Sequence, residues 1–167
     1  MEISIWLQSI LVGIGATLIM DSWSWSWSWW QKNILHNPTL DYTFVGRWFI
    51  YRGQLVHRPI MATPSVKEET FLGWFLHYFI GIIIALIHVL IFGEMWLFEP
   101  TLTPALMTGF VTIVFPFYVI QSCLGFGIAA NKTPSPWKAR WLSLLTHSVY
   151  GLRLFFAALS LKYLVHV

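Results

Sequence analysis

The sequence predicts an all-α, polytopic membrane protein with four transmembrane helices in a bundle. Three observations carry this prediction. Of the 167 residues, 57% are apolar and only 10% are charged, against roughly 25% charged in an ordinary soluble domain. The mean hydropathy is +0.65. Four stretches each supply the ~20 apolar residues that a helix needs to cross a bilayer. The length suits a single domain over residues 1–167.

The four expected spans cover residues 3–30, 71–93, 103–127 and 141–161. The amino end is not expected to be a cleavable signal peptide, because Met1-Glu2 is not followed by a basic stretch or a small-residue cleavage site. The second and third spans carry no Asp, Glu, Lys or Arg, whereas Arg153 interrupts the fourth. Pro116 is expected to kink the third span and to free a carbonyl there.

A low-complexity run of serine and tryptophan occupies Ser22 to Trp30. Strict alternation suits a half-buried strand, but a lone strand at a membrane surface would leave its backbone unpaired. We therefore expect the first helix to continue through the run. At about 100° per residue, Thr17 and Asp21 then share a polar ridge with Ser24 and Ser28. The tryptophans on the other side are expected to form an interfacial belt.

Basic residues are concentrated in two loops. The first and third loops carry eight lysines and arginines, and the second loop carries none. The positive-inside rule therefore places the first and third loops in the cytoplasm and both termini outside.

A short interfacial helix is expected in the first loop, between Thr39, which can cap it, and Gly53, which would end it. Its apolar face recurs at helical spacing and is formed by Leu40, Phe44, Trp48 and Tyr51. This pattern indicates a helix in the headgroup layer; the alternative is an irregular loop on the membrane surface. Four residues of this loop are expected to contact the interface and its phosphates: Arg47, Trp48, Arg52 and Arg58.

Ionisable side chains within spans are costly and by default indicate function. Asp21, His77 and His147 are the candidates for a ligand or proton site, with Thr17 and Ser143 on the same helical faces. The two histidines each lie six residues into a helix that starts from the cytoplasm, which gives both a depth of ~9 Å at 1.5 Å per residue. Asp21 closes the first span on the same side. The sequence therefore predicts a polar pocket near the cytoplasmic side.

Several roles suit the paired histidines, and the sequence leaves them open. The pair could ligate haem, bind a transition metal with Asp21 as a third ligand, relay a proton, or only tie helices together. Arg153 projects about 120° from His147 and is expected to pair with Asp21 or with lipid phosphate. Hydrolase signatures and phosphate-binding loops are absent from the sequence, which favours a non-enzymatic role.

Two stretches, His77-x-x-x-Gly81 and His147-x-x-x-Gly151, open the second and fourth spans. The first and third spans share a looser match, Gly13 to Thr17 against Gly109 to Thr112. The pattern indicates a duplicated two-helix hairpin. The alternative is a chance similarity between short apolar helices.

Six motifs in order give the chain a family resemblance: GIGATLIMD (13–21), LDYTFVGRW (40–48), GWFLHYFIG (73–81), PTLTPALMTG (100–109), GFGIAANKTPSP (125–136) and SLLTHSVYGL (143–152). Over nearly its whole length the chain resembles the bacterial inner-membrane proteins grouped as domain of unknown function 2938. The resemblance implies a small multi-pass protein of the bacterial inner membrane and implies no activity. Asp21, Arg47, His77 and His147 lie within the motifs; Arg153 and the serine-tryptophan run do not.

From these observations we expect an integral membrane protein that binds or moves a small ligand, proton or ion through the polar pocket. One alternative is a haem- or metal-binding redox protein that uses His77 and His147. Another is a structural or assembly subunit of a membrane complex. The lipid bilayer is the expected partner, with a homo-oligomer as a further option and nucleic acid not expected.

Overall fold

The computed structural model describes residues 4–34, 41–51 and 59–165, and it describes the side chains of these residues except for 23–34 and 165. The described residues form helices and turns and contain no strand, which confirms the predicted all-α class. The chain divides into two compact units. Unit 1 comprises residues 1–40, 78–109 and 148–167, and unit 2 comprises residues 41–77 and 110–147.

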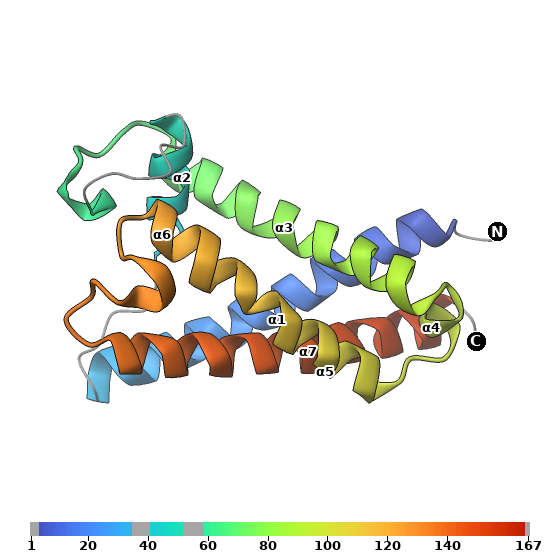
Figure 1. The fold of residues 1–167 in the computed structure, drawn as a ribbon. Coiled ribbons are helices and arrows are strands. Elements are labelled where there is room, and N and C mark those ends of the chain that lie inside the picture. The colour runs from blue at the N-terminus through green and yellow to red at the C-terminus, as the bar shows by residue number, and fades with distance from the viewer. Residues whose placement is uncertain (1–3, 35–40, 52–58, 166–167) are drawn as a thin grey trace. The chain divides into compact units, whose positions relative to one another are not determined.

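The elements follow one another along the chain in Figure 1: α1 (Ile5–Ile34), α2 (Thr43–Ile50), the 3-10 turn η1 (Ile60–Ala62), α3 (Glu69–Phe92), α4 (Met95–Phe98), α5 (Leu102–Thr112), the π segment η2 (Phe115–Ile120), α6 (Gln121–Cys123), the 3-10 turn η3 (Ile128–Ala130) and α7 (Pro136–Val165). Four stretches are long and apolar enough to cross a membrane: Ile5–Ser22, Glu69–Phe92, Leu102–Cys123 and Pro136–Leu164. This finding confirms the predicted number of spans.

The ends of the helices differ from the predicted ends for local reasons. The third span ends at Cys123, because Gly125 and Gly127 follow with positive φ values of 79° and 76°, a conformation that ends helices. The fourth helix begins five residues earlier than predicted, at Pro136, since proline suits the first helical position. α1 continues through the serine-tryptophan run to Ile34, as predicted. The tryptophan belt stays a prediction, because those side chains lie outside the described ones.

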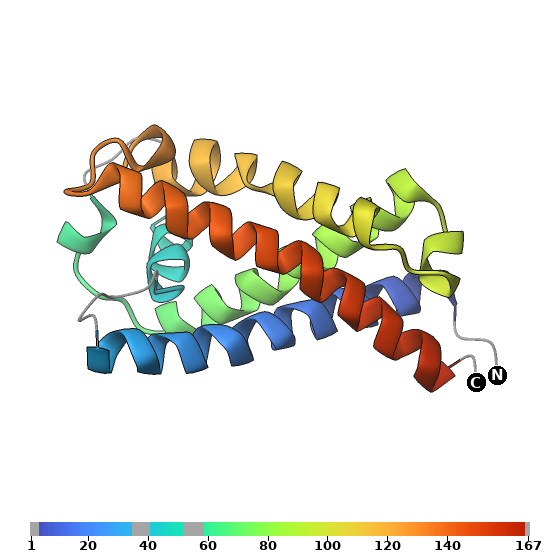
Figure 2. The ribbon, with the colours of Figure 1, turned by 90° about the horizontal axis from the view of Figure 1, so that it is seen from below.

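Unit 1 packs helices at very short range through glycines. A Cβ on Gly13 of α1 would lie 2.7 Å from the Cα of Ile82 of α3, and a Cβ on Gly151 of α7 would lie 2.7 Å from the carbonyl oxygen of Ala105 of α5. Small residues allow such close contacts between helices in membranes. Within this unit the start of α1, the helix α4 and the end of α7 lie at one end in both views (Figures 1 and 2). This arrangement fits helices that cross the membrane in alternating directions.

Unit 2 joins α2 to the beginning of α3. A Cβ on Gly46 would collide with the backbone of Glu69, and one on Gly73 would collide with the carbonyl of Tyr42. Its small core consists of Val45, Ile60 and Leu124, with further apolar side chains packed against it: Phe44, Trp48, Leu76, Ile120 and Phe126. The two loops of this unit are also linked, because the N–H of Ile60 donates to the carbonyl of Leu124 over 3.0 Å.

The helix predicted between Thr39 and Gly53 is present as α2, but it begins at Thr43. The carboxylate Oδ1 of Asp41 accepts the N–H of Thr43 over 2.9 Å and so pairs one of the free donors at the start of the helix. Thr39 and Gly53 lie outside the described residues. The interfacial position of α2 stays a prediction.

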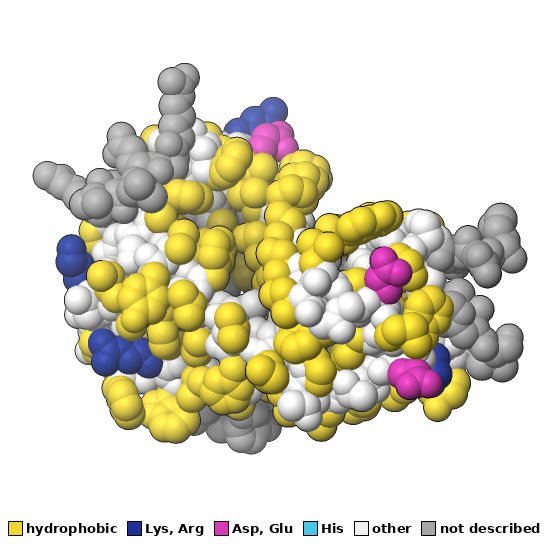
Figure 3. All heavy atoms as spheres, turned by 45° about the vertical axis from the view of Figure 1, so that its right-hand side comes forward, with side chains coloured by type: hydrophobic (Ala, Val, Ile, Leu, Met, Phe, Trp, Pro, Cys, Tyr) yellow, Lys and Arg dark blue, Asp and Glu magenta, His cyan; other side chains and the backbone are white. Residues whose placement is uncertain are grey.

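Hydrophobic side chains cover most of the face drawn in Figure 3, and acidic and basic side chains are few on it. Large apolar residues are exposed on the spans, among them Leu90 (67% exposed), Ile91 (69%) and Phe110 (56%). A monomeric soluble protein rarely exposes so much contiguous apolar surface. The surface therefore agrees with helices that face lipid.

Candidate functional site

Pro116 interrupts the third span and produces a π turn. Proline has no N–H to donate to the carbonyl four residues earlier, so α5 ends at Thr112 and the chain continues as the π segment Phe115–Ile120. At the end of this segment the N–H of Gln121 donates to the carbonyl of Pro116, five residues back. Such turns are rare and are often found at functional sites. The distortion predicted at Pro116 therefore takes the form of a π turn.

The π turn sets the direction of Gln121. In an unbroken α-helix, nine residues at about 100° each would place Gln121 about 180° from Thr112. A π turn holds about one residue more than an α turn, which reduces this angle to about 80°. Thr112 and Gln121 can therefore both face α7, where Ser143 and His147 lie one helical turn apart.

Two hydrogen bonds join the third span to α7. The amide Nε2 of Gln121 donates to the Oγ of Ser143 over 3.1 Å. The Oγ1 of Thr112 and the Nδ1 of His147 are also hydrogen-bonded, at 3.1 Å. Together with Ser122, these residues form what we call the Gln121 cluster, and all of its members belong to unit 2.

Two polar atoms of the Gln121 cluster have no hydrogen-bond partner within the described part of the chain. They are the Oε1 of Gln121 and the Oγ of Ser122, and both are buried. Gln121 as a whole is only 9% exposed. An amide oxygen can accept two hydrogen bonds, and leaving a buried polar group unpaired costs about 1–3 kcal/mol. The cluster can therefore accept a hydrogen bond from a donor that enters it.

Of the site residues predicted from the sequence, His147 and Ser143 belong to this cluster. His77 has different neighbours: its ring stacks on Tyr42 with centroids 3.9 Å apart and planes 20° apart. The ring of Trp74 lies edge-on to His77, 6.0 Å away. Tyr42 directly precedes α2, so His77 takes part in the contact between α2 and α3. The predicted pairing of His77 with His147 stays a prediction.

Asp21 and Thr17 belong to unit 1. The hydroxyl of Thr17 donates to the carbonyl of Gly13 over 2.8 Å and lies against Gly81, where a Cβ would collide with it. The carboxylate of Asp21 accepts a hydrogen bond from the hydroxyl of Tyr78. The sequence predicts that Asp21 shares a pocket with the two histidines, and that also stays a prediction.

Arg47 is buried in unit 2 and bound by protein groups. Its guanidinium pairs with Glu69 at 2.7 Å and donates to the carbonyl of Thr63 over 3.0 Å. The hydrogen bond with Glu69 raises the pKa of Arg47, against the lowering effect of burial, so the guanidinium stays charged. The predicted phosphate contact of Arg47 remains a prediction, as does that of Trp48, which packs on the small core of unit 2.

Arg52 and Arg58 lie outside the described residues. Arg153 is 4% exposed and belongs to unit 1; its pairing with Asp21 or lipid phosphate stays a prediction. Within the described ranges, no three His, Cys, Asp or Glu side chains lie together as a metal site would require.

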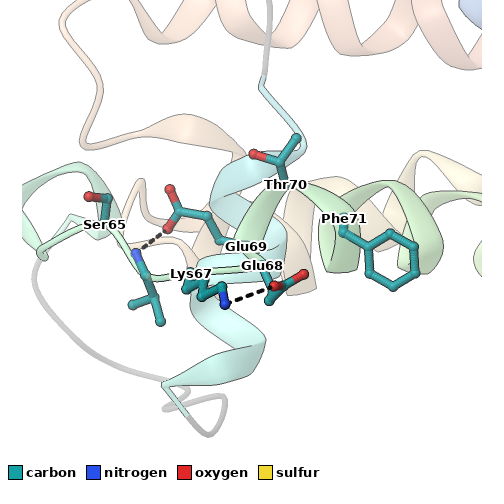
Figure 4. A pocket seen from close by; sticks show the side chains of 7 residues that line it. Ser65, Lys67, Glu68, Glu69, Thr70 and Phe71 are labelled. Atoms are coloured by element: carbon teal, nitrogen blue, oxygen red, sulfur yellow. Dashed lines mark hydrogen bonds and ion pairs between the residues drawn. The ribbon is translucent and has the colours of Figure 1, made fainter.

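An open hollow lies where the first loop enters α3 (Figure 4). It is lined by the single segment 65–71. Lys67 and Glu68 point outward and form an exposed ion pair at 3.9 Å, while the N–H of Val66 donates to the Oε2 of Glu69 over 2.9 Å. Its charged groups already have partners, because Lys67 pairs with Glu68 and Glu69 pairs with Arg47. This hollow therefore gives no reason to place a ligand there.

Sequence reasoning missed Gln121, Thr112 and Glu69. The site residues predicted from the sequence were groups that ionise within spans and hydroxyls on the same helices, and the third span, which carries Thr112 and Gln121, has no Asp, Glu, Lys, Arg or His. Glu69 lies just before the apolar stretch predicted as the second span and looked like an ordinary flanking charge. The useful signal was Gln121 in an otherwise apolar segment, five residues after a proline.

The fold and the cluster define a class: helical proteins with four stretches able to cross a membrane and polar groups buried between the third and the fourth. The chain matches the family model described as "Protein of unknown function (DUF2938)" over residues 10–161. It therefore belongs to this family, and the resemblance carried by the six motifs is confirmed. Comparisons with curated proteins and with solved structures found no match.

Proposed function

We propose that this protein binds or moves a small hydrogen-bond-donating solute, a proton or an ion at the Gln121 cluster. The observation that carries the proposal is the buried Oε1 of Gln121, an acceptor without a partner in the described structure. A polar group inside a span is expensive and is usually retained for function. A ligand that donates to this oxygen would offset the cost of burying it.

Two further features support this proposal. The cluster lies directly after a π turn in an interrupted span, and transporters commonly place their binding sites at interrupted membrane helices. The cluster also contains His147, and imidazole is a side chain that can pass protons and ligate cations. Protons and small cations are therefore the first ligands to test.

The test uses the full chain in liposomes that contain a pH-sensitive dye, with an imposed membrane potential. Proton, sodium and rubidium fluxes are compared for the unaltered protein, Gln121→Leu and Thr146→Val. Thr146 is a matched control, since its hydroxyl is exposed and donates to the carbonyl of Leu142 on its own helix, α7. We expect Gln121→Leu to reduce one of these fluxes by about tenfold, the equivalent of 1.4 kcal/mol, and Thr146→Val to leave it unchanged.

Binding without movement is tested by the melting temperature of the detergent-purified protein. Sodium, potassium and ammonium chloride are titrated at several pH values, because a ligand that binds the folded state raises its stability. The proposal predicts a rise that Gln121→Leu removes. The proposal is wrong if no ion moves and if no ion stabilises the unaltered protein more than it stabilises Gln121→Leu.

We also propose that the protein lies in a bacterial inner membrane with both termini outside. Apart from Lys32, Arg153 and Lys162, the described lysines and arginines belong to unit 2, whereas Glu94 and Glu99 flank α4 in unit 1. This distribution supports a cytoplasmic position for the loops of unit 2.

The redox alternative, with His77 and His147 as ligands, is separated from this proposal by a visible spectrum and a metal analysis of the purified protein. A Soret band that both His77→Ala and His147→Ala abolish would favour haem. The assembly alternative predicts that Asp21, His77 and His147 can all be replaced by alanine without loss of the cellular phenotype.

A further inference from the structure

His88 is a buried histidine in unit 1 to which the proposed function gives no role. It lies on α3, one turn before the end of that helix, and is 1% exposed. Its Nδ1 is 2.6 Å from the Oγ1 of Thr108 of α5. Its Nε2 is buried and has no hydrogen-bond partner among the described residues. In either tautomer this nitrogen is an unsatisfied donor or acceptor, and buried polar atoms are normally paired.

Aromatic rings surround the imidazole. The indole of Trp96 lies edge-on to it with centroids 4.1 Å apart and planes at 71°, and the ring of Phe92 lies 4.8 Å away at 39°. Trp96 is itself 4% exposed. The indole therefore fills the space beside His88 as a flat ligand would, but it forms no hydrogen bond with Nε2.

The segment that carries Trp96, residues 93–101, is held together by its own hydrogen bonds, and we call it the Trp96 loop. The indole Nε1 donates to the carbonyl of Thr101 over 3.1 Å, and the N–H of Trp96 donates to the carbonyl of Gly93 over 3.2 Å. The polar atom of the indole is thus paired within the loop, and its contact with His88 is a contact between rings. These hydrogen bonds lie within the loop, whereas its side chains Trp96 and Leu97 pack into the apolar core of unit 1.

Gly93 supplies a hinge at the start of the loop. It has a φ of +88°, and no atom lies within 4 Å of the position of a Cβ there. Glycine adopts this conformation at no steric cost, and the open space leaves room for rotation. Figure 1 shows α4, which belongs to the loop, between the end of α3 and the start of α5.

We propose that His88 and the Trp96 loop form a closed binding site for a flat apolar ring that carries one hydrogen-bonding oxygen. The Trp96 indole occupies the ring position until such a ligand displaces it. The ligand replaces the ring contacts of the indole and adds the hydrogen bond to Nε2 that the indole lacks. The site lies wholly in unit 1, so it does not depend on the proposed role of the Gln121 cluster.

The first test vacates the site by Trp96→Ala, since an apolar cavity left by a large side chain can bind a small aromatic molecule. The probe is 2-naphthol, and naphthalene, which has the same ring system without the hydroxyl, is the control ligand. We expect Trp96→Ala to bind one 2-naphthol per chain, roughly five- to tenfold more tightly than naphthalene, from the net value of one hydrogen bond. The double variant Trp96→Ala/His88→Leu should bind both compounds equally. The proposal is overturned if both variants prefer 2-naphthol to naphthalene by the same factor, or if Trp96→Ala shows no saturable binding of 2-naphthol.

A second test uses the protein with its tryptophan in place. Diethylpyrocarbonate modifies accessible imidazole nitrogens, and mass spectrometry of peptides gives the rate at His88. We expect His88 to react slowly in the unaltered chain. The reaction should be several-fold faster in Gly93→Ala, because the positive φ strains the new side chain. In both proteins 2-naphthol should slow the reaction. A rate at His88 that responds neither to the hinge substitution nor to 2-naphthol contradicts a displaceable loop.

Discussion

Arg47 of α2 and Glu69, the first residue of α3, form a bidentate ion pair. The Nε and one terminal nitrogen of the guanidinium lie 2.7 Å and 2.8 Å from the two carboxylate oxygens. The two side chains are each only 11% exposed. The same guanidinium reaches the carbonyl of Thr63, and Glu69 also accepts the N–H of Val66. The pair therefore fixes the first loop onto the start of the second span.

The first prediction concerns the stability of this junction. Arg47→Ala leaves the buried carboxylate of Glu69 without its partner, which typically costs 3–5 kcal/mol. We expect the free energy of unfolding to fall by about that amount, measured in detergent with a mild denaturant. The matched control is Lys67→Ala, which breaks an exposed pair with Glu68 and should cost about 0–1 kcal/mol. A loss in Arg47→Ala no larger than that in Lys67→Ala would contradict a structural role for the pair.

The second prediction concerns the π turn. Cysteines at Gln121 and Ser143, with Cys123 replaced by serine, should be cross-linked readily because the native side chains are hydrogen-bonded. Adding Pro116→Ala restores the missing N–H, so the third span can return to α-helical spacing and rotate position 121 by about 100°. Cross-linking should then fall severalfold. A cysteine pair at Thr112 and His147 is the control, since Thr112 precedes the turn; equal losses at both pairs would indicate general unfolding instead.

The third prediction concerns the glycine contact between α2 and α3. A Cβ on Gly73 would collide with the backbone of Tyr42, which cannot move aside without displacing α2. Gly73→Ala should therefore destabilise the protein by about 1–3 kcal/mol, the usual cost of overpacking. At Gly15 the new Cβ would lie 3.3 Å from the side chain of Ala157, so Gly15→Ala should cost less. Thermal unfolding of the two variants in one detergent gives the comparison, and the reverse order would refute the close contact at Gly73.

The fourth prediction concerns orientation. Reporter fusions after Pro38, Met95 and Ser135 should indicate cytoplasm, periplasm and cytoplasm, because the basic residues are concentrated in the first and third loops. Fusions that place position 135 in the periplasm would reverse the proposed orientation. A fusion at 95 on the same side as the other two would question the number of spans.

The glycines of the two His-x-x-x-Gly stretches, on which the predicted duplication of a hairpin rests, both lie in helix contacts of unit 1. Gly81, from the first His-x-x-x-Gly stretch, packs against Thr17 of the preceding span, and Gly151, from the second, packs against Ala105 of its preceding span. Each glycine thus packs against its preceding span, but at positions that the sequence match does not align, because it sets Thr17 against Thr112 and not against Ala105. The histidines of the two stretches have different partners, Tyr42 for His77 and Thr112 for His147, so duplication itself stays a prediction.

The sequence by itself determined the all-α class, the four spans and the helix through the serine-tryptophan run. These features follow from composition, from apolar length and from the need of each backbone group for a partner in lipid. Each of these features depends on the residues of one segment or on the composition of the whole chain, so it can be recognised without knowledge of the folded structure. The same is true of Pro116, whose missing N–H acts on its own helix.

Only the tertiary structure decided which polar groups meet. Gln121 faces Ser143 because a π turn takes up about one extra residue, and no residue count shows where a helix will take up that residue. Arg47 pairs with Glu69, a partner that its loop position did not suggest, because Gly46 and Gly73 let α2 and α3 come into backbone contact. Asp21 and Tyr78 are partners for a related reason: the contact of Gly13 with α3 sets the register between α1 and α3. Partners of this kind depend on helix register and packing distance, which are properties of pairs of helices and not of any single segment.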